Sequence, residues 1–208
     1  MMKLYYSPGA CSQAVHILLH EADLGHTSER VDLRAKLTET GTDYWTINPK
    51  GAVPALDIGN GEILTENSAI LQYLGDLSSD SRLLPPVGQL RRYRVLEWLN
   101  FIATELHKGF GPLWNSAATI ESKEGARDML AKKFDFAEQK LGAGPFVTGD
   151  TLTIADPYLF VMLGWTGHHG IDLGRWPGLV AFTERMRQRP AVNTVLRAEG
   201  LVEEEVAG

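Results

Sequence analysis

Short alternating runs of apolar and polar residues open the chain, with one helical stretch between them. Residues 2–7 and 27–33 have the alternation of strands, and residues 12–25 have the period of an amphipathic helix that stops at Gly25. The helical stretch carries apolar side chains every fourth residue: Ala14, Leu18 and Ala22. The pattern predicts a strand, a helix and a second strand.

The next part of the chain predicts a hairpin followed by a helix. Residues 53–58 and 62–65 are strand-like and are joined by Gly-Asn-Gly at 59–61, which favours a tight turn. A helical pattern returns over 67–77. The first 78 residues are therefore predicted to form a βαβ–ββα unit.

Beyond residue 78 the strand patterns stop. Residues 78–89 contain two prolines and a glycine with little periodicity, which is typical of a linker. Helical patterns then cover 90–110, 123–142, 154–165, 178–190 and 191–200. The predicted organisation is an α/β domain at 1–78, a linker at 79–90 and an all-α domain at 91–208.

Composition excludes several classes of protein. The chain has 208 residues, 44% hydrophobic and 22% charged, with a net charge of −6, and an acidic surface is unfavourable for nucleic acids and anionic membranes. The N-terminus lacks the apolar core of a signal peptide, and no run approaches the ~20 apolar residues of a membrane span. We therefore expect a cytoplasmic protein.

Cys11, the single cysteine of the chain, lies where the first strand gives way to a helix. The N–H groups and dipole at a helix N-terminus favour a thiolate by about 0.3–1 kcal/mol, which is a modest effect. The alternative is a small buried apolar side chain, as most lone cysteines are. With no second thiol nearby, a reactive Cys11 would act on the sulfur of a partner molecule.

An ordered series of motifs runs from end to end: KLYYSPGACS, NPKGAVPAL, LTENSAILQYL, EWLNFIATELHKGFGPL, TIADPYLF and RAEGL. On these motifs the chain resembles the cytosolic glutathione transferases, and most closely the bacterial beta class. The resemblance implies a thioredoxin-like domain followed by a helical domain, glutathione as co-substrate without a metal, and a homodimer. It also makes Cys11 the expected catalytic thiol.

For the first domain the resemblance implies a set of glutathione contacts. Val53, before a cis Pro54, would bind the cysteinyl backbone. Glu66 and Asn67 would hold the γ-glutamyl group at a helix N-terminus, and Lys36 would face the glycyl carboxylate. The residues by themselves allow simpler roles: an ordinary turn proline, a helix cap at Asn67 and a solvated loop lysine.

The predicted helix over 90–110 carries two stripes. The apolar seam consists of Leu96, Leu99, Ala103, Leu106 and Phe110. The resemblance implies glutathione contacts from the polar side of the same helix: Asn100, Thr104, Glu105, His107 and Lys108. His107 would act near the glutathione sulfur, and Asn100 would reach across the dimer interface; a structural role for His107 is the alternative.

The remaining polar motifs receive mainly structural interpretations. Thr153 and Asp156 have the spacing of a capping box. His16 and His20 are four apart, as zinc ligands can be, but the sequence offers neither a third ligand nor an H-E-x-x-H order, so we expect no metal. His168 and His169 either line a second-substrate pocket or belong to a loop.

Three functions remain open on the sequence. Conjugation of glutathione to a small hydrophobic electrophile is favoured by His107 and by Phe110, Trp114 and Trp165 near the expected second site. Thiol–disulfide exchange is favoured by Cys11. A non-enzymatic carrier of glutathione and apolar ligands is the third, and a zeta-class isomerase would require an SSCSxR-like start that this chain lacks.

Overall fold

A computed structural model describes residues 1–142 and 144–202 of the chain. The chain divides into two compact units, the first formed by residues 1–80 together with the chain from Arg187 onward, and the second by residues 81–186. This differs from the division expected from the sequence, in which the whole of 91–208 formed one helical domain. The reason is that the last helix, α8 (Pro190–Ala198), packs against α1 (Ser12–Glu21) of the first unit.

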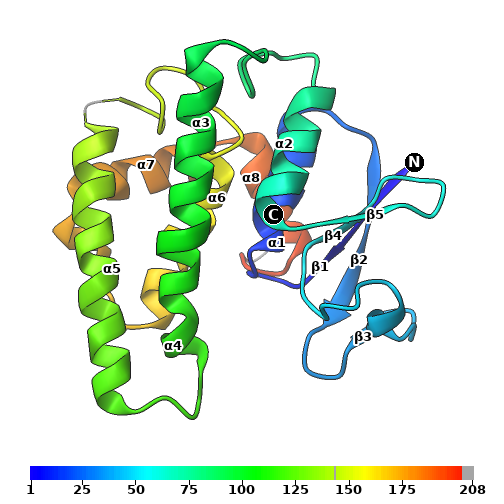
Figure 1. The fold of residues 1–208 in the computed structure, drawn as a ribbon, viewed down its shortest axis with the longest axis horizontal. Coiled ribbons are helices and arrows are strands. Elements are labelled where there is room, and N and C mark those ends of the chain that lie inside the picture. Colours follow the sequence, from blue (N-terminus) through cyan, green and yellow to red (C-terminus); the bar gives the residue numbers. More distant parts are fainter. Residues whose placement is uncertain (143, 203–208) are drawn as a thin grey trace, which may run out of the picture. The chain divides into compact units, whose positions relative to one another are not determined.

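The first unit is built on a five-stranded mixed sheet in the order β3-β2-β1-β4-β5 (Figure 1). The strands are β1 (Met2–Tyr6), β2 (His26–Asp32), β3 (Leu37–Thr38), β4 (Ala55–Asp57) and β5 (Ile63–Thr65). β1 runs parallel to β2 and antiparallel to β4, and β5 returns antiparallel to β4. This confirms the predicted βαβ–ββα order; only β3, which is two residues long, has no signal in the hydrophobic pattern.

Alternation along the strands divides their side chains between two faces of the sheet. Helices α1 and α2 (Asn67–Leu77) pack against each other on one face, toward which Tyr6 points, because its ring contacts His16 of α1. On the other face Tyr5 packs with Val31 and with Tyr44 of η1 (Tyr44–Thr46). Both faces of the sheet are therefore covered within this unit.

An ion pair fixes the return of the chain to the first unit. The guanidinium of Arg189, just before α8, donates to both carboxylate oxygens of Glu21 at the end of α1, at 2.5 and 2.7 Å. A bidentate ion pair of this kind fixes the relative orientation of the two side chains as well as the distance between them. It joins the end of α1 to the start of α8.

In the described residues of the second unit the regular elements are helices, apart from an isolated bridge between Phe146 and Gly149. The unit contains α3 (Leu90–Phe101), η2 (Ile102–His107), η3 (Lys108–Phe110), α4 (Gly111–Trp114), α5 (Ile120–Leu141), α6 (Asp156–His168), η4 (Leu173–Arg175) and α7 (Pro177–Arg187). α5 runs alongside the long helical segment that begins as α3 (Figure 1). The side chain of Thr119 caps α5 by accepting from the Ser122 N–H.

The helical segment over 90–110 is not a uniform α-helix. Residues Ile102–His107 form a π-helix and Lys108–Phe110 a 3-10 turn, so the side-chain period changes within the segment. The buried seam is accordingly Val95, Leu99, Ile102, Leu106 and Phe110. The sequence-based seam was wrong at Leu96 and Ala103, which are only half-buried.

The expected linker is packed rather than solvated along part of its length. Leu83 and Leu84 are buried, and the Leu83 carbonyl accepts from the Ile154 N–H at 3.0 Å. Arg92 donates to the Pro85 carbonyl. The part of the linker from residue 81 onward thus contributes to the second unit.

Among the described residues, none of the helices combines the length and the apolar character that crossing a lipid bilayer requires.

Candidate functional site

Cys11 lies in the turn between β1 and α1 and is buried. Its thiol donates to the Val53 carbonyl, with 3.2 Å between sulfur and oxygen. The Val53–Pro54 peptide bond is cis, as the resemblance implied, so Pro54 is not an ordinary turn proline. The structure therefore brings together two predicted site residues that are 42 positions apart.

Glu199 follows α8, and its carboxylate stabilises the turn that contains Cys11. The sequence analysis did not identify this residue. Its carboxylate accepts from the Gly9 N–H at 2.9 Å and from the Gln13 amide at 3.0 Å, and it contacts His16 Nδ1 at 3.0 Å. Gly9 has a φ of +68°, which favours glycine. The RAEGL motif contains Glu199, but no local pattern reveals that this carboxylate lies beneath residues 9–16.

At the N-terminus of α2 lies the buried side-chain amide of Asn67, which makes no hydrogen bond within the described residues. Asn67 is 7% exposed, and neither its side-chain nitrogen nor its oxygen has a hydrogen-bond partner within the described residues. The alternative that Asn67 caps the helix is wrong, since Glu66 occupies the cap position and no side chain caps α2. Glu66 has a φ of +73°, a conformation that is uncommon for a residue with a side chain.

Two lysines lie beside these elements. Lys50 Nζ pairs with the Glu66 carboxylate at 2.5 Å and donates to the Thr65 hydroxyl. Lys36 Nζ donates to the Gly51 carbonyl at 2.6 Å and lies 5.4 Å from the centre of the Trp45 ring. The ammonium of Lys36 is thus held by the loop that leads to Val53, and it is not a freely solvated charge.

Gly51 is required for this arrangement. It has a φ of +60°, and a Cβ at this position would lie 2.6 Å from carbon atoms of the Trp45 ring. Any side chain would displace the ring over which Lys36 lies. The motif around Pro54 therefore includes a glycine whose role is steric.

In the second unit, His107 belongs to an aromatic cluster that is centred on Trp165. Its Nδ1 lies 2.6 Å from the Tyr158 hydroxyl, which fixes the orientation of the ring. The Trp165 ring lies 5.1 Å from that of His107, and Trp114 lies 5.4 Å from Trp165. Phe110 contacts Trp165 as well. The structure thus brings His107 and the apolar residues that were expected near the second substrate into one cluster.

Both adjacent histidines lie near Trp114, the His168 ring at 6.5 Å, and His169 lies closer. Its ring lies 4.3 Å from that of Trp114, and its Nε2 is buried without a hydrogen-bond partner in the described residues. Burial, followed by the charges of His168, Arg127 and Lys123, lowers the pKa of His169 below its usual 6.5. His168 is the last residue of α6 and is exposed.

The polar residues predicted on α3 and η2 do not share one environment. Asn100, Thr104 and Lys108 are exposed, and the Thr104 hydroxyl donates to the Asn100 carbonyl. Glu105 instead pairs with Lys133 of α5 at 2.6 Å. The π-helical turn, a feature often found at functional sites, lies in the middle of this group. No sequence period predicted it.

The predicted capping box of Thr153 and Asp156 is present only in part. The Asp156 carboxylate accepts from the N–H and the hydroxyl of Thr153, and also from the Val147 N–H. Ala155, however, occupies the cap position of α6, and no side chain caps this helix, so Thr153 is not the cap residue.

The expectation that His16 and His20 have no third ligand nearby was wrong. A third histidine, His26, lies beside His16 and His20, so a set of three imidazoles exists in the first unit.

A separate pocket of about 750 Å³ in the second unit is lined by residues of α3 and α5 and by residues 144, 147, 148 and 149. It contains none of the predicted site residues.

The predicted site residues are divided between the two units. Cys11, Lys36, Val53, Glu66 and Asn67 belong to the first unit; Asn100, Thr104, Glu105, His107 and Lys108 belong to the second.

Comparison with known proteins identifies both units. The family model of the glutathione S-transferase N-terminal domain matches residues 8–77, and that of the C-terminal domain matches residues 101–190. Glutathione S-transferase GstA of Escherichia coli O157:H7 is 46% identical over 200 residues, which cover 96% of this chain and 100% of the relative.

Solved structures agree with this result. A glutathione transferase from Methylococcus capsulatus strain Bath has 50% identity and a TM-score of 0.95, covering 97% of this chain and 100% of its own. The bacterial beta-class glutathione S-transferase of Sphingomonas chungbukensis has 44% identity and a TM-score of 0.92, covering 96% and 100%. The chain therefore belongs to the glutathione S-transferase family and has bacterial beta-class members among its relatives.

Proposed function

We propose that this glutathione transferase conjugates glutathione to small hydrophobic electrophiles and also catalyses thiol–disulfide exchange through Cys11. The observation that carries the exchange reaction is the Cys11 thiol, held 3.2 Å from the backbone carbonyl that precedes the cis proline. A sphingomonad glutathione S-transferase with 44% identity to this chain was solved in complex with glutathione. We therefore place glutathione beside Cys11.

Glutathione is a peptide with a charged group at each end, and the first unit offers a partner for each part. The unpartnered amide of Asn67 and the N–H groups at the start of α2 suit the γ-glutamyl carboxylate. Glu66 neutralises the ammonium of the same group. Lys36, held over Trp45, faces the glycyl carboxylate, and the Val53 backbone pairs with the cysteinyl residue.

In conjugation the nucleophile is the thiolate of glutathione. Donor groups placed where negative charge resides stabilise it, and a helix N-terminus such as that of α1 provides such donors. The hydroxyl of Ser12 is already occupied, since it donates to the Ser7 carbonyl and accepts from the Ser7 N–H. His107 is the ionisable side chain that we assign to this reaction. The exposed Trp114, packed on Trp165, receives the apolar electrophile, and the buried Phe110 supports Trp165.

In exchange, the Cys11 thiolate attacks the glutathione sulfur of a mixed disulfide. A Cys11–glutathione disulfide forms, and the other thiol leaves as a thiolate that takes up a proton. A second glutathione thiolate then attacks the glutathione sulfur of this disulfide, which releases oxidised glutathione and restores Cys11. Because the chain has only one cysteine, glutathione itself must act as the resolving thiol.

The working protein in this proposal is a cytoplasmic homodimer in which Asn100 contacts glutathione bound to the partner subunit. Exposure of Asn100 supports this role, since a buried side chain could not reach a second chain. The competing proposal, a non-enzymatic carrier, requires neither Cys11 nor His107 for its function.

Substitution of the single thiol tests the proposal. Cys11→Ala is expected to abolish reduction of a glutathione mixed disulfide, because the chain has no other thiol to form the intermediate, while conjugation of a chloronitroarene continues at a reduced rate. Steady-state rates in both assays, with mass spectrometry for a glutathione adduct on Cys11 of the parent protein, provide the measurement. If Cys11→Ala retains full exchange activity, the proposed intermediate is wrong; if both variants Cys11→Ala and His107→Ala retain all activity, the sites are wrong.

A further inference from the structure

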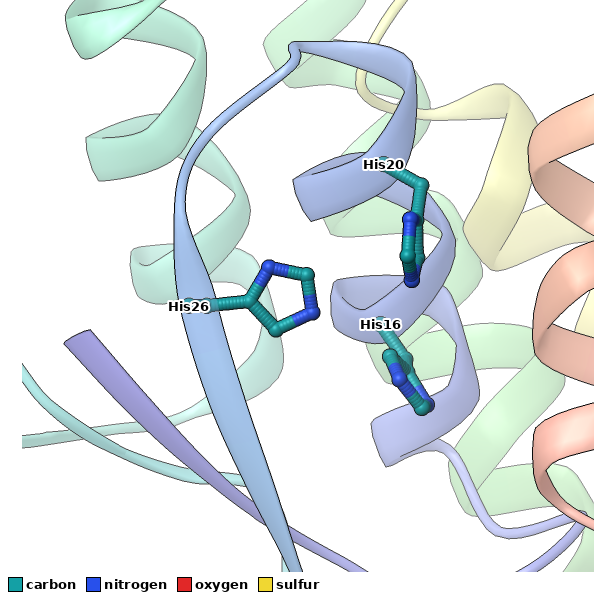
Figure 2. A group of neighbouring side chains, drawn as sticks. All are labelled: His16, His20 and His26. Atoms are coloured by element: carbon teal, nitrogen blue, oxygen red, sulfur yellow. The ribbon is translucent and has the colours of Figure 1, made fainter. Parts of the chain in front are cut away.

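Three histidine side chains converge in the first unit, on the face of the sheet covered by α1. His16 and His20 lie on successive turns of α1, and His26 projects from the start of β2 toward both of them (Figure 2). One nitrogen atom of each ring lies within 4.8 Å of the others. The three rings bring together two elements that the loop 22–25 joins.

The rings of His16 and His26 each use Nδ1 in a hydrogen bond, so Nε2 is the nitrogen of each ring that remains for a metal. Nδ1 of His26 lies 2.8 Å from the Leu24 carbonyl, which can only accept, so Nδ1 carries the proton and Nε2 has a lone pair. Nδ1 of His16 lies 3.0 Å from the buried Glu199 carboxylate, which orients this ring in the same way. A carbonyl or carboxylate behind the distal nitrogen is the usual support of a metal-binding histidine.

We propose that His16, His20 and His26 form a binding site for a divalent transition metal of the zinc class. Imidazole nitrogen is a ligand that Zn²⁺, Ni²⁺ and Cu²⁺ prefer, whereas Mg²⁺ prefers oxygen. A tetrahedral site with Zn–N bonds of about 2.0–2.1 Å has nitrogens about 3.3–3.4 Å apart. The three nitrogens would have to approach by up to about 1.4 Å from the 4.8 Å limit, which small side-chain rotations provide.

The fourth coordination position would be open to water. His16 is buried and His26 half-buried, but His20 is exposed, so solvent reaches the cluster from the His20 side. Three protein ligands with an exchangeable fourth position define an open site. Bound metal would join α1 to β2 and so stabilise the first unit.

Protonation does not compete strongly with a metal at this site. Partial burial of the imidazole ring lowers the pKa of His20 even though the residue is exposed at one side, and the neighbouring rings of His26 and His16 lower it further. Burial also lowers the pKa of His26 below 6.5, despite the opposing effect of the Leu24 carbonyl. Both rings are therefore mainly neutral at pH 7, as metal ligands must be.

Titration of the whole chain, without any added histidine tag and after treatment with a chelator, tests the site. Calorimetry with Zn²⁺ is expected to show saturable binding of one ion per chain, and Mg²⁺ is expected to give no such binding. Zn²⁺ at about 100 times its dissociation constant should raise the midpoint of thermal unfolding by about 5–10 °C.

Variants distinguish this cluster from the other possible ligands of the chain. His26→Gln and His20→Gln should each weaken Zn²⁺ binding at least tenfold and remove the thermal shift, and neither residue contacts the proposed glutathione site. Cys11→Ala and His168→Gln, which remove a thiol and an exposed imidazole elsewhere, should bind Zn²⁺ as the parent does. Absence of saturable binding, or equal binding by His26→Gln and His20→Gln, would overturn the proposal.

Discussion

At the scale of single residues, the buried side chain of Asn67 is the clearest sign of a ligand. A buried polar group without a partner costs a folded protein roughly 1–3 kcal/mol. Asn67 has two such atoms at the start of α2, where helix N–H groups attract anions. A ligand carboxylate would accept from the Asn67 side-chain nitrogen and from the helix N–H groups.

Asn67→Ala is therefore expected to weaken glutathione binding by about tenfold or more while leaving stability unchanged or slightly higher, because no hydrogen bond within the protein is lost. Calorimetric titration with glutathione and urea unfolding measure the two effects. Asn193→Ala is the matched control, since the Asn193 amide donates to the Arg187 and Arg189 carbonyls. That variant should lose stability and keep its affinity. The opposite pattern would remove Asn67 from the site.

The His107 ring is oriented by a hydrogen bond with the Tyr158 hydroxyl at 2.6 Å. His107→Ala is expected to lower kcat/KM for conjugation by about tenfold or more, near the lower end of what a positioned acid–base group contributes. Tyr158→Phe keeps the ring packing but loses the hydrogen bond, so a smaller decrease and a shifted pH–rate profile are expected. Equal rates for all three proteins across the pH range would contradict a catalytic His107.

At the scale of elements, the strands of the sheet are held together by a buried carboxylate. Glu29 of β2 pairs with Lys3 of β1 and accepts from the Thr40 hydroxyl beyond β3. Burial by itself would raise the pKa of Glu29, but the hydrogen bonds from Lys3, Thr40 and Thr38 outweigh it and lower the pKa from 4.5 to about 2. The charged form of Glu29 therefore stabilises the folded sheet.

Glu29→Gln is expected to lower the free energy of unfolding at pH 7 by about 1–2 kcal/mol, a value discounted because Lys3 is partly exposed. Since the folded-state pKa is depressed, this contribution is complete above pH 4.5 and disappears as the pH falls toward 2. Urea unfolding of both proteins across this range measures it. Glu124→Gln, at an exposed site without a partner among the described residues, should show no difference at any pH.

At the scale of the whole molecule, the chain returns from its helical unit to the first unit. Arg189 and Glu199 fix α8 and the residues after it to α1, so the support of the Cys11 turn comes from almost 190 residues away in the sequence. The proposed dimer adds a further level, since Asn100 would act on glutathione bound to the partner subunit.

Dilution of the protein tests whether activity depends on assembly of the dimer as well as on folding of the chain. If Asn100 completes the site of the partner subunit, activity per chain should fall as the dimer dissociates, because the monomer lacks one of the glutathione contacts. Sedimentation and rate measurements over the same concentration range test this. The variant Asn100→Ala should bind glutathione more weakly while its dimer persists. A monomer with full activity would exclude the arrangement.

The sequence determined the fold class and most of the elements, because hydrophobic periodicity reports which faces are buried within a helix or strand. It also indicated Cys11, Val53 and the contact between Thr153 and Asp156, since a turn, a cis proline and a helix start are local features or parts of a family motif. No local pattern predicted the contact between the Cys11 sulfur and the Val53 carbonyl, or the pKa shifts of the ionisable side chains.

Only the tertiary structure decided which distant residues meet. The Glu199 carboxylate beneath Gly9, the unpartnered amide of Asn67 and the approach of His26 to His16 and His20 all depend on how elements pack, and packing leaves no periodic trace in the sequence. The π-helical turn over 102–107 is similar, because its residues have no distinct propensity and tertiary contacts select the wider turn. Local interactions thus fixed the elements of this protein, and long-range packing fixed its sites.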